Sequence, residues 1–217
     1  MAINKPALPY VKICGITNRE DALLAAKLGA HALGFNFSQE KSLRQITPAQ
    51  AKTIIAALPP FVTTVGIFTD IAEAEILATL TEVPLQVLQF HGSETDAECT
   101  RYHKPYIKAL AMKPDTDIHN LIAQYPHASA ILLDTYHPQK FGATGLTFDW
   151  KTIPANINKP IILAGGLSAT NVAQAIRVAK PYAVDVCSGV EASIGKKDPN
   201  KLMAFFNEVQ HAFDTQN

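Results

Sequence analysis

Short apolar segments recur along the chain, and most of them are separated by Ala/Leu-rich segments with helical spacing. The apolar segments have the length of strands, and they are apolar throughout rather than alternating with polar residues. That pattern is typical of strands in a parallel sheet that is covered on both faces. The eight strand-like segments are residues 10–14, 32–37, 62–68, 85–90, 106–111, 130–134, 160–164 and 183–186.

Strands that alternate with helices predict βαβ units and a parallel sheet. Eight such units across 217 residues predict an α/β fold, the (β/α)8 TIM barrel. No linker, low-complexity tract or charge run divides the sequence, so residues 1–217 are expected to form a single barrel domain. A doubly wound open sheet is the alternative. It usually carries a Gly-rich turn after its first strand, and this chain has CGIT there instead of GxGxxG.

Several helix starts can be read from capping residues. Thr17 and Thr47 each precede Glu or Gln by three residues, which predicts two capping boxes. Asp70 is followed by Glu73 in the same way, and Asp198 with Pro199 is expected to begin the last helix.

The charge of the chain is balanced, with 19 Lys and Arg residues against 19 Asp and Glu residues. No basic excess calls for nucleic acid or an anionic membrane as a partner. No apolar stretch reaches the roughly 18 to 20 residues of a membrane span, and the N-terminal MAINKPALPY lacks a signal-peptide core. We therefore expect a cytoplasmic protein. Its three cysteines have no CxxC or Cys/His spacing, which predicts neither a disulfide framework nor a zinc site.

Three small-residue loops follow the last three predicted strands, and they read GATG, AGGLS and CSGVE. Glycine lets backbone N–H groups approach an anion closely, and the loops after strands seven and eight are the usual phosphate site of such barrels. SGVE is expected to form a short extra helix. Simple tight turns are the alternative. The candidate phosphate-binding residues are Gly145, Gly165, Gly166, Ser188 and Gly189.

Ionisable residues stand where apolar strands end, which is the catalytic end of a barrel. Asp134 ends AILLDT, where it is either an acid–base group or a cap of the next loop. Cys14 ends the first strand and shares a face with Lys12, a cation that would lower the pKa of the thiol, although most lone strand cysteines only pack. Asp185 lies inside an apolar run and needs a buried partner, so a structural ion pair is expected.

Other polar residues near these strand ends have two possible roles each. Arg44, in the polar loop after the second strand, is either a surface arginine or a bidentate clamp for a substrate carboxylate. His91, after the fourth strand, is either structural or a donor that lines the site. Cys99 is expected to be a packing residue, and no thiol chemistry is assigned to Cys187.

Together these residues resemble a known family. The segments VKICGIT, LGFNF with a following S-x-R, VGIF, LQFHG, LLDT, GATGLTFDW, ILAGGL and VDVCSGVE occur in the order found in phosphoribosylanthranilate isomerase. The match runs from about Tyr10 to the last helix. Each motif alone is weak, but the ordered set is specific.

The resemblance implies a (β/α)8 barrel that isomerises N-(5-phosphoribosyl)anthranilate in tryptophan biosynthesis. The product is 1-(2-carboxyphenylamino)-1-deoxyribulose 5-phosphate, formed by an Amadori rearrangement without cofactor or metal. By the family pattern Cys14 would be the general base, Asp134 the general acid and Arg44 the clamp for the anthranilate carboxylate. The chain departs from the pattern at Ala143, where glycine is frequent, and at Cys187, where serine is common.

Two other functions fit part of this pattern. A dual-substrate isomerase that also acts on a histidine-pathway aminoimidazole generally has aspartate at the first strand end, where this chain has Cys14. A phosphate-binding barrel without catalysis is not expected to keep the acid, the base and the clamp together. The expected partner is a phosphorylated small molecule, with no nucleic acid and no membrane, and the sequence is compatible with a monomer or a homodimer.

Overall fold

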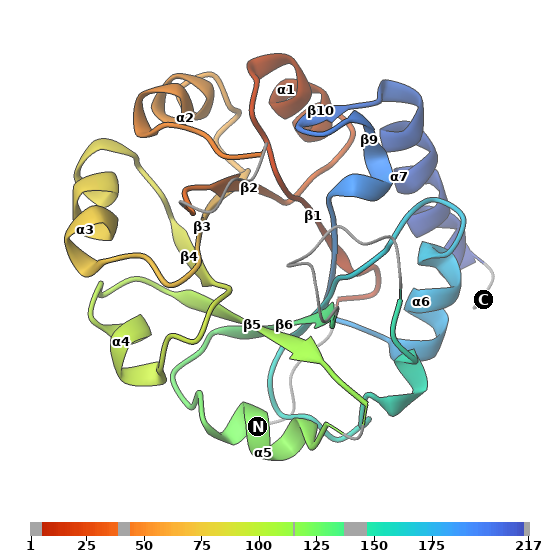
Figure 1. The fold of residues 1–217 in the computed structure, drawn as a ribbon. Coiled ribbons are helices and arrows are strands. Elements are labelled where there is room, and N and C mark those ends of the chain that lie inside the picture. The colour runs from red at the N-terminus through yellow and green to blue at the C-terminus, as the bar shows by residue number, and fades with distance from the viewer. Residues whose placement is uncertain (1–5, 39–43, 115, 137–146, 215–217) are drawn as a thin grey trace.

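The computed structural model describes residues 6–38, 44–114, 116–136 and 147–214. Eight parallel strands form a closed barrel in chain order, and β1 closes it by pairing with both β2 and β8. Helices surround this ring of strands, as Figure 1 shows in a view along the barrel. The predicted (β/α)8 architecture is therefore confirmed.

The strands coincide closely with the apolar segments of the sequence, and no end differs by more than two residues. Their bounds are β1 Tyr10–Ile13, β2 Ala32–Asn36, β3 Thr63–Phe68, β4 Val87–Phe90, β5 Tyr106–Met112, β6 Ala130–Thr135, β7 Ile161–Leu163 and β8 Ala183–Val186.

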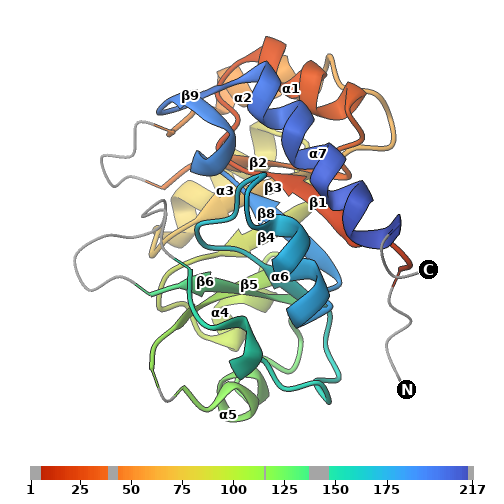
Figure 2. The same ribbon diagram turned by 90° about the vertical axis from the view of Figure 1, so that its right-hand side faces the viewer.

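The helices follow the strands on the outside. They are α1 Arg19–Lys27, α2 Pro48–Ile55, α3 Glu73–Glu82, α4 Asp96–Thr100, α5 Ile118–Ala123, α6 Val172–Ala179 and α7 Pro199–Asp214. Helix α7 contacts both α1 and α6, and so completes the outer layer beside β1 (Figures 1 and 2). Among the described residues, no helix is both long and apolar enough to cross a membrane.

Two of the predicted helix starts are confirmed. Thr47 forms the capping box of α2. The Asp198 carboxylate accepts hydrogen bonds from the first backbone N–H groups of α7, at Asn200 and Lys201. These bonds satisfy donors that the helix itself leaves without a partner.

The other two capping predictions are wrong. Asn18, not Thr17, caps α1, because the Thr17 hydroxyl donates instead to the carbonyl of Gly195. Helix α3 begins after Ala72 without a side-chain cap, and the Asp70 carboxylate accepts from the backbone and hydroxyl of Ser93. In both cases a contact with a distant loop replaces the local bond.

A short hairpin follows β8 that the sequence pattern did not predict. The 3-10 helix η2 (Ser188–Val190) is the expected short turn of helix, and β9 (Glu191–Ser193) and β10 (Lys196–Lys197) then pair antiparallel before α7. A second 3-10 helix, η1 (Trp150–Thr152), stands between β6 and β7 where a sixth helix was expected.

Alternation along the strands decides which side chains fill the barrel. In β6, Ile131 and Leu133 pack with the outer core against the helices, while Ala130 and Leu132 belong to the inner core. Asp134 continues the inner series at the end of the strand. Small and branched apolar side chains thus close the barrel interior, and polar side chains stand above them at the carboxyl ends of the strands.

Candidate active site

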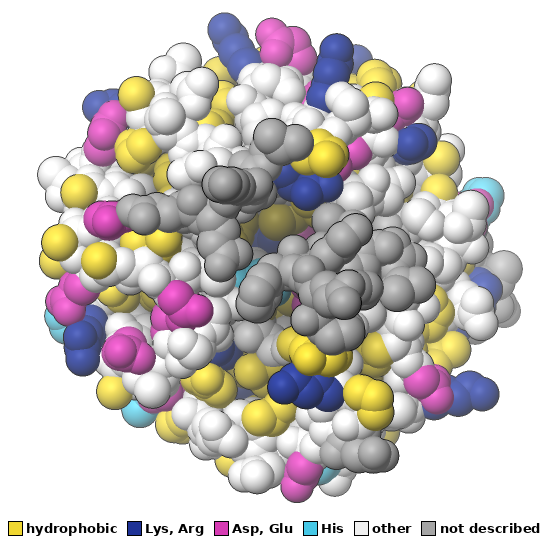
Figure 3. Space-filling view, in the orientation of Figure 1, with side chains coloured by type: hydrophobic (Ala, Val, Ile, Leu, Met, Phe, Trp, Pro, Cys, Tyr) yellow, Lys and Arg dark blue, Asp and Glu magenta, His cyan; other side chains and the backbone are white. Residues whose placement is uncertain are grey.

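A cavity of about 180 Å³ opens at the carboxyl ends of the barrel strands. Figure 3, in the orientation of Figure 1, shows this face hollowed at its centre, with basic, histidine and apolar side chains inside the hollow. Most of the site residues predicted from the sequence line the cavity, namely Cys14, Arg44, His91, Asp134, Gly165, Gly166 and Ser188. Gly145 lies outside the described residues, as does Ala143, so the GATG loop is not compared.

Gly189 does not line the cavity. Its backbone packs closely against the loop that follows β7. A Cβ at this position would stand 1.9 Å from the carbonyl oxygen of Leu167, in the loop after β7. Gly165 in that same loop has φ +82°, and a Cβ there would lie 2.8 Å from Asp134 Oδ1. Glycine at these two positions therefore lets the loops after β7 and β8 lie together beside Asp134.

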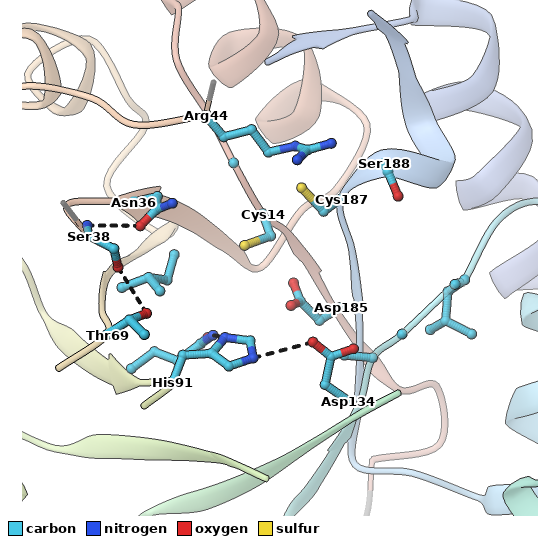
Figure 4. A pocket seen from close by; sticks show the side chains of 17 residues that line it. Cys14, Asn36, Ser38, Arg44, Thr69, His91, Asp134, Asp185, Cys187 and Ser188 are labelled. Atoms are coloured by element: carbon cyan, nitrogen blue, oxygen red, sulfur yellow. Dashed lines mark hydrogen bonds and ion pairs between the residues drawn. The ribbon is translucent and has the colours of Figure 1, made fainter. Parts of the chain in front are cut away.

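Cys14 follows β1, and its backbone N–H continues the ladder to β8 by donating to Val186 O at 2.9 Å. Its side chain faces the cavity next to Cys187 (Figure 4). A hydrogen bond from the Cys187 side chain lowers the pKa of Cys14 well below the ordinary value of a thiol, and the nearby cations Lys12 and Lys197 lower it further, against the opposing effect of burial. Cys14 is therefore poised to ionise.

Lys12 stands two residues before Cys14 on the same face of β1, as the alternation predicted. Its Nζ lies 2.9 Å from Asp185 Oδ1, and both side chains are buried. Burial alone would lower the pKa of Lys12, but the charges of Asp185 and Cys14 hold it above its usual value. The ion pair expected for Asp185 is confirmed, and burial raises the pKa of that carboxyl to about 7 despite the bond to Lys12.

Asp134 is the next-to-last residue of β6 and points into the cavity, opposite His91 (Figure 4). One carboxylate oxygen, Oδ1, accepts from the backbone N–H of Thr135 at 2.8 Å, and the other lies 3.3 Å from His91 Nε2. Burial works against a charged His91, but the Asp134 carboxylate raises the pKa of the imidazole above its ordinary value. The side chain of Asp134 thus accepts a local backbone hydrogen bond, as expected of a loop cap, and it also lines the cavity, where an acid–base group would have to stand.

Arg44 reaches the cavity from the loop before α2 and is largely buried. Its Nε and Nη2 donate to the two carboxylate oxygens of Glu191, at 2.8 and 2.7 Å. Lys197, whose side chain is wholly buried, also lies 3.2 Å from Glu191 Oε1. Arg44 is thus neither a surface residue nor a lone cation, because a carboxylate from the hairpin after β8 fixes one edge of its guanidinium.

Sequence reasoning missed the residues that the unpredicted hairpin brings to the site. Glu191 begins β9 and Lys197 ends β10, and Lys197 Nζ also donates to Cys187 O at 3.2 Å and approaches Cys187 Sγ at 3.9 Å. A buried Lys–Glu pair cannot be told from solvated charges in GVEASIGKKD. The only local signal is that Glu191 directly follows the small residues of the SGVE motif.

The pocket also has polar residues on the side of β2, β3 and β4. Asn36 Oδ1 accepts from Ser38 N at 3.0 Å, and Ser38 Oγ donates to Thr69 Oγ1 at 2.9 Å. Gln89 is buried beside His91, at 3.4 Å from Nε2 to Nδ1, and its Oε1 has no hydrogen-bond partner among the described residues. Within the described part of the chain, no group of three or more His, Cys, Asp or Glu residues is arranged to hold a metal ion.

Comparisons with known proteins show which family the chain belongs to. Residues 11–208 match the family model described as N-(5'phosphoribosyl)anthranilate (PRA) isomerase. The chain is 55% identical over 199 residues to the N-(5'-phosphoribosyl)anthranilate isomerase of Pseudomonas fluorescens, and the alignment covers 92% of this chain and 97% of that relative.

Solved structures give the same answer. The phosphoribosylanthranilate isomerase of Thermotoga maritima superposes with a TM-score of 0.86 at 40% identity, covering 94% of this chain and all of that one (100%). A phosphoribosylanthranilate isomerase in complex with reduced 1-(o-carboxyphenylamino)-1-deoxyribulose 5-phosphate superposes with a TM-score of 0.83 at 39% identity, over 94% and 100% of the two chains. The resemblance seen in the sequence is confirmed, and the chain belongs to the N-(5'-phosphoribosyl)anthranilate isomerase family.

Proposed function

We propose that this pocket carries out the isomerisation of its family with Cys14 as general base and Asp134 as general acid. The family reaction converts N-(5-phosphoribosyl)anthranilate to 1-(2-carboxyphenylamino)-1-deoxyribulose 5-phosphate on the route to tryptophan. One observation carries the assignment of roles: Cys14 and Asp134 stand at the carboxyl ends of two different strands, β1 and β6, and line one cavity bordered by the loops after β7 and β8 (Figure 4).

The reaction needs one group protonated and the other ionised. Asp134 donates its proton to the furanose ring oxygen, the ring C–O bond breaks and a Schiff base forms. Cys14 then removes the proton from ribose C2, which gives an enolamine that tautomerises to the ketone. The lowered pKa of Cys14 supports its part, because a thiolate is the form that accepts a proton.

Arg44 is proposed to bind the anthranilate carboxylate. Glu191 holds the Nε edge of the guanidinium through two charge-assisted hydrogen bonds, and this fixes the direction in which the cation faces the cavity. His91 stands beside Asp134 and is proposed to contact the substrate near the ring oxygen.

The phosphate is proposed to bind at the loops after β7 and β8, through the backbone of Gly165, Gly166, Ser188 and Gly189. Three of these residues line the cavity, and Gly189 keeps the two loops in contact. Backbone N–H groups at such loops give anions a preorganised site. Anchoring the phosphate orients the reacting carbons between Cys14 and Asp134.

The remaining expectations are also proposals. The substrate is a phosphorylated small molecule, as the ligand of the related complex is. We place the protein in the cytoplasm, with residues 1–217 acting as one catalytic domain. It is proposed to act as a monomer or a homodimer, and both forms are described for the Thermotoga maritima relative.

Turnover of phosphoribosylanthranilate by the purified chain tests this function. The fluorescence of the substrate is followed until it is consumed, and the product is separated from the substrate by chromatography before its mass is measured. We expect saturable loss of fluorescence with formation of an isomer of equal mass. Absence of turnover by protein with the circular dichroism spectrum of a folded α/β barrel would overturn the proposal.

A further inference from the structure

Two of the three cysteines of the chain lie next to one another in the cavity, although they are far apart in the sequence. The strands β1 and β8 pair in register with Ile13 opposite Val186, and Cys14 and Cys187 are the residues that directly follow the two strands. Neighbouring strands stand about 4.8 Å apart, within the Cα separation of roughly 4.4–6.8 Å that a disulfide bridges. Both side chains line the cavity, where a small solute reaches them (Figure 4).

We propose that Cys14 and Cys187 form an oxidation site for small hydroperoxides, in which the two thiols close an intramolecular disulfide. Cys14 is the residue that meets the peroxide. Its environment favours the thiolate, since Lys12 lies beside it and Lys197 and His91 add positive charge. Thiolates with nearby cations and access to solvent are the cysteines that peroxides oxidise first.

The first step is a two-electron transfer with a simple balance. The Cys14 thiolate attacks one peroxide oxygen, so an S–O bond forms and the O–O bond breaks. Cys14 becomes a sulfenic acid, and the other oxygen leaves as hydroxide or alkoxide and takes a proton from water.

The second step uses Cys187, whose reactivity depends on the first. A hydrogen bond to Cys14 and burial hold the pKa of Cys187 well above the usual value, so it is a thiol while Cys14 is a thiolate. Oxidation of Cys14 removes that negative charge. Lys197 Nζ, at 3.9 Å from Cys187 Sγ, then favours the Cys187 thiolate. Cys187 attacks Cys14 Sγ, an S–S bond forms, the S–O bond breaks, and hydroxide leaves with the proton of Cys187 as water.

Cys99 provides the matched control within the same chain. It is completely buried in α4, away from the cavity, and burial raises its pKa to about 12. A residue of this kind packs as a small hydrophobe and does not react. The C99S and C187S variants therefore carry the same Cys→Ser substitution. They differ only in whether the lost thiol is buried in α4 or lines the cavity.

The consequence for activity rests on the proposed function, because the disulfide removes the base Cys14. The chemistry of the two thiols rests only on their geometry. A cross-link that forms without loss of turnover would support the oxidation site and contradict the role of Cys14, so the two proposals fail separately.

The experiment treats the full chain with hydrogen peroxide, in the presence and absence of dimedone, and then maps peptides and measures turnover. For the wild type and C99S we expect a Cys14–Cys187 cross-linked peptide, a mass lower by two hydrogen atoms, and loss of turnover that dithiothreitol restores. For C187S we expect dimedone on Cys14 and no cross-linked peptide. We also expect a loss of turnover that dithiothreitol no longer reverses after long exposure to peroxide, because the sulfenic acid has then been oxidised to the sulfinic acid. Each rate is compared with the untreated form of the same variant.

Two results would overturn the proposal. One is wild-type protein that carries dimedone on Cys14 as readily as C187S does and forms no cross-linked peptide. The other is a cross-link that joins Cys99. The wild-type peptide map gives its result even where C187S fails to fold, and C187A provides a second variant.

Discussion

Lys12 and Asp185 form a 2.9 Å ion pair inside the barrel, two residues before Cys14 on the seam between β1 and β8. The lysine shares its charge between the carboxylate and the Cys14 sulfur, and the interactions with both raise its pKa. The structural ion pair and the proposed base Cys14 thus interact with the same ammonium group. The carboxylate of Asp185 allows the barrel interior to hold a cation beside the Cys14 thiol.

The K12M variant is expected to move the acid limb of kcat/KM to higher pH. In the wild type Lys12 lowers the pKa of Cys14, so the base is ionised at lower pH, and removal of the cation raises that pKa. The loss also leaves Asp185 buried without its partner, which lowers the free energy of unfolding by about 3 kcal/mol. Rate profiles and urea unfolding measure both effects. The exposed K27M variant should change neither, and an unchanged acid limb in K12M would contradict the role of Lys12.

The D134N variant is expected to lose about 10²-fold or more in kcat, the usual worth of an acid–base group. It also removes the carboxylate that raises the pKa of His91, so the imidazole should titrate at lower pH. NMR of the histidine C–H signals follows that shift directly. A His91 pKa that is the same in D134N and in the wild type would mean that the contact at 3.3 Å has no electrostatic effect.

The same pair predicts a pH dependence of stability. The pKa of His91 is raised in the folded state, so the pair contributes fully below the unfolded histidine pKa of about 6.5. The contribution is lost as pH rises through the higher folded pKa. Unfolding curves at a series of pH values should show the wild type losing more stability than D134N across this window, and equal losses would count against the pair.

The E191Q variant is expected to weaken substrate binding and stability together. Glu191 holds Arg44 through two hydrogen bonds and neutralises the buried Lys197, and both cations lower its pKa. Breaking a buried ion pair costs about 3 kcal/mol, and a guanidinium that is no longer fixed should raise KM roughly tenfold, or about 1.4 kcal/mol. Steady-state kinetics measure KM for E191Q. The E82Q variant, which changes an exposed glutamate, serves as the control. A KM equal to that of E82Q would remove the positioning role of Glu191.

The G189A variant is expected to raise KM while kcat changes less. The added Cβ would stand 1.9 Å from Leu167 O, so the loops after β7 and β8 must separate, at a cost of about 1–3 kcal/mol in stability. Gly29 has φ +102° with open space around it, in the turn before β2 at the other end of the barrel. The G29A variant should therefore lose stability through backbone strain with KM unchanged, and the same KM in both variants would contradict the loop argument.

The barrel could be predicted from the sequence because each strand is a short apolar run with a clear end. The position of Lys12 relative to Cys14 followed from alternation alone, and the need of Asp185 for a partner followed from its place in the apolar run AVDV. The partner itself required the closure of β1 on β8, which local pattern does not contain.

The rest of the site depends on contacts between distant segments. Arg44 and Glu191 are 147 positions apart, and nothing near either residue indicates the other. The hairpin β9–β10 is too short to give a strand pattern, so the sequence gives no sign that Lys197 is buried at the site. Cys187 was assigned no thiol chemistry because its neighbour Cys14 approaches it only across the closed seam of the barrel.

The central claim is that Cys14 is the base, and kcat of the C14A variant tests it most directly. Turnover of phosphoribosylanthranilate is followed by its fluorescence, beside C99A, in which a buried thiol outside the cavity is removed. We predict that C14A stays folded and loses about 10²-fold or more in kcat, while C99A keeps the wild-type value. A folded C14A enzyme with a kcat close to that of C99A would contradict the account.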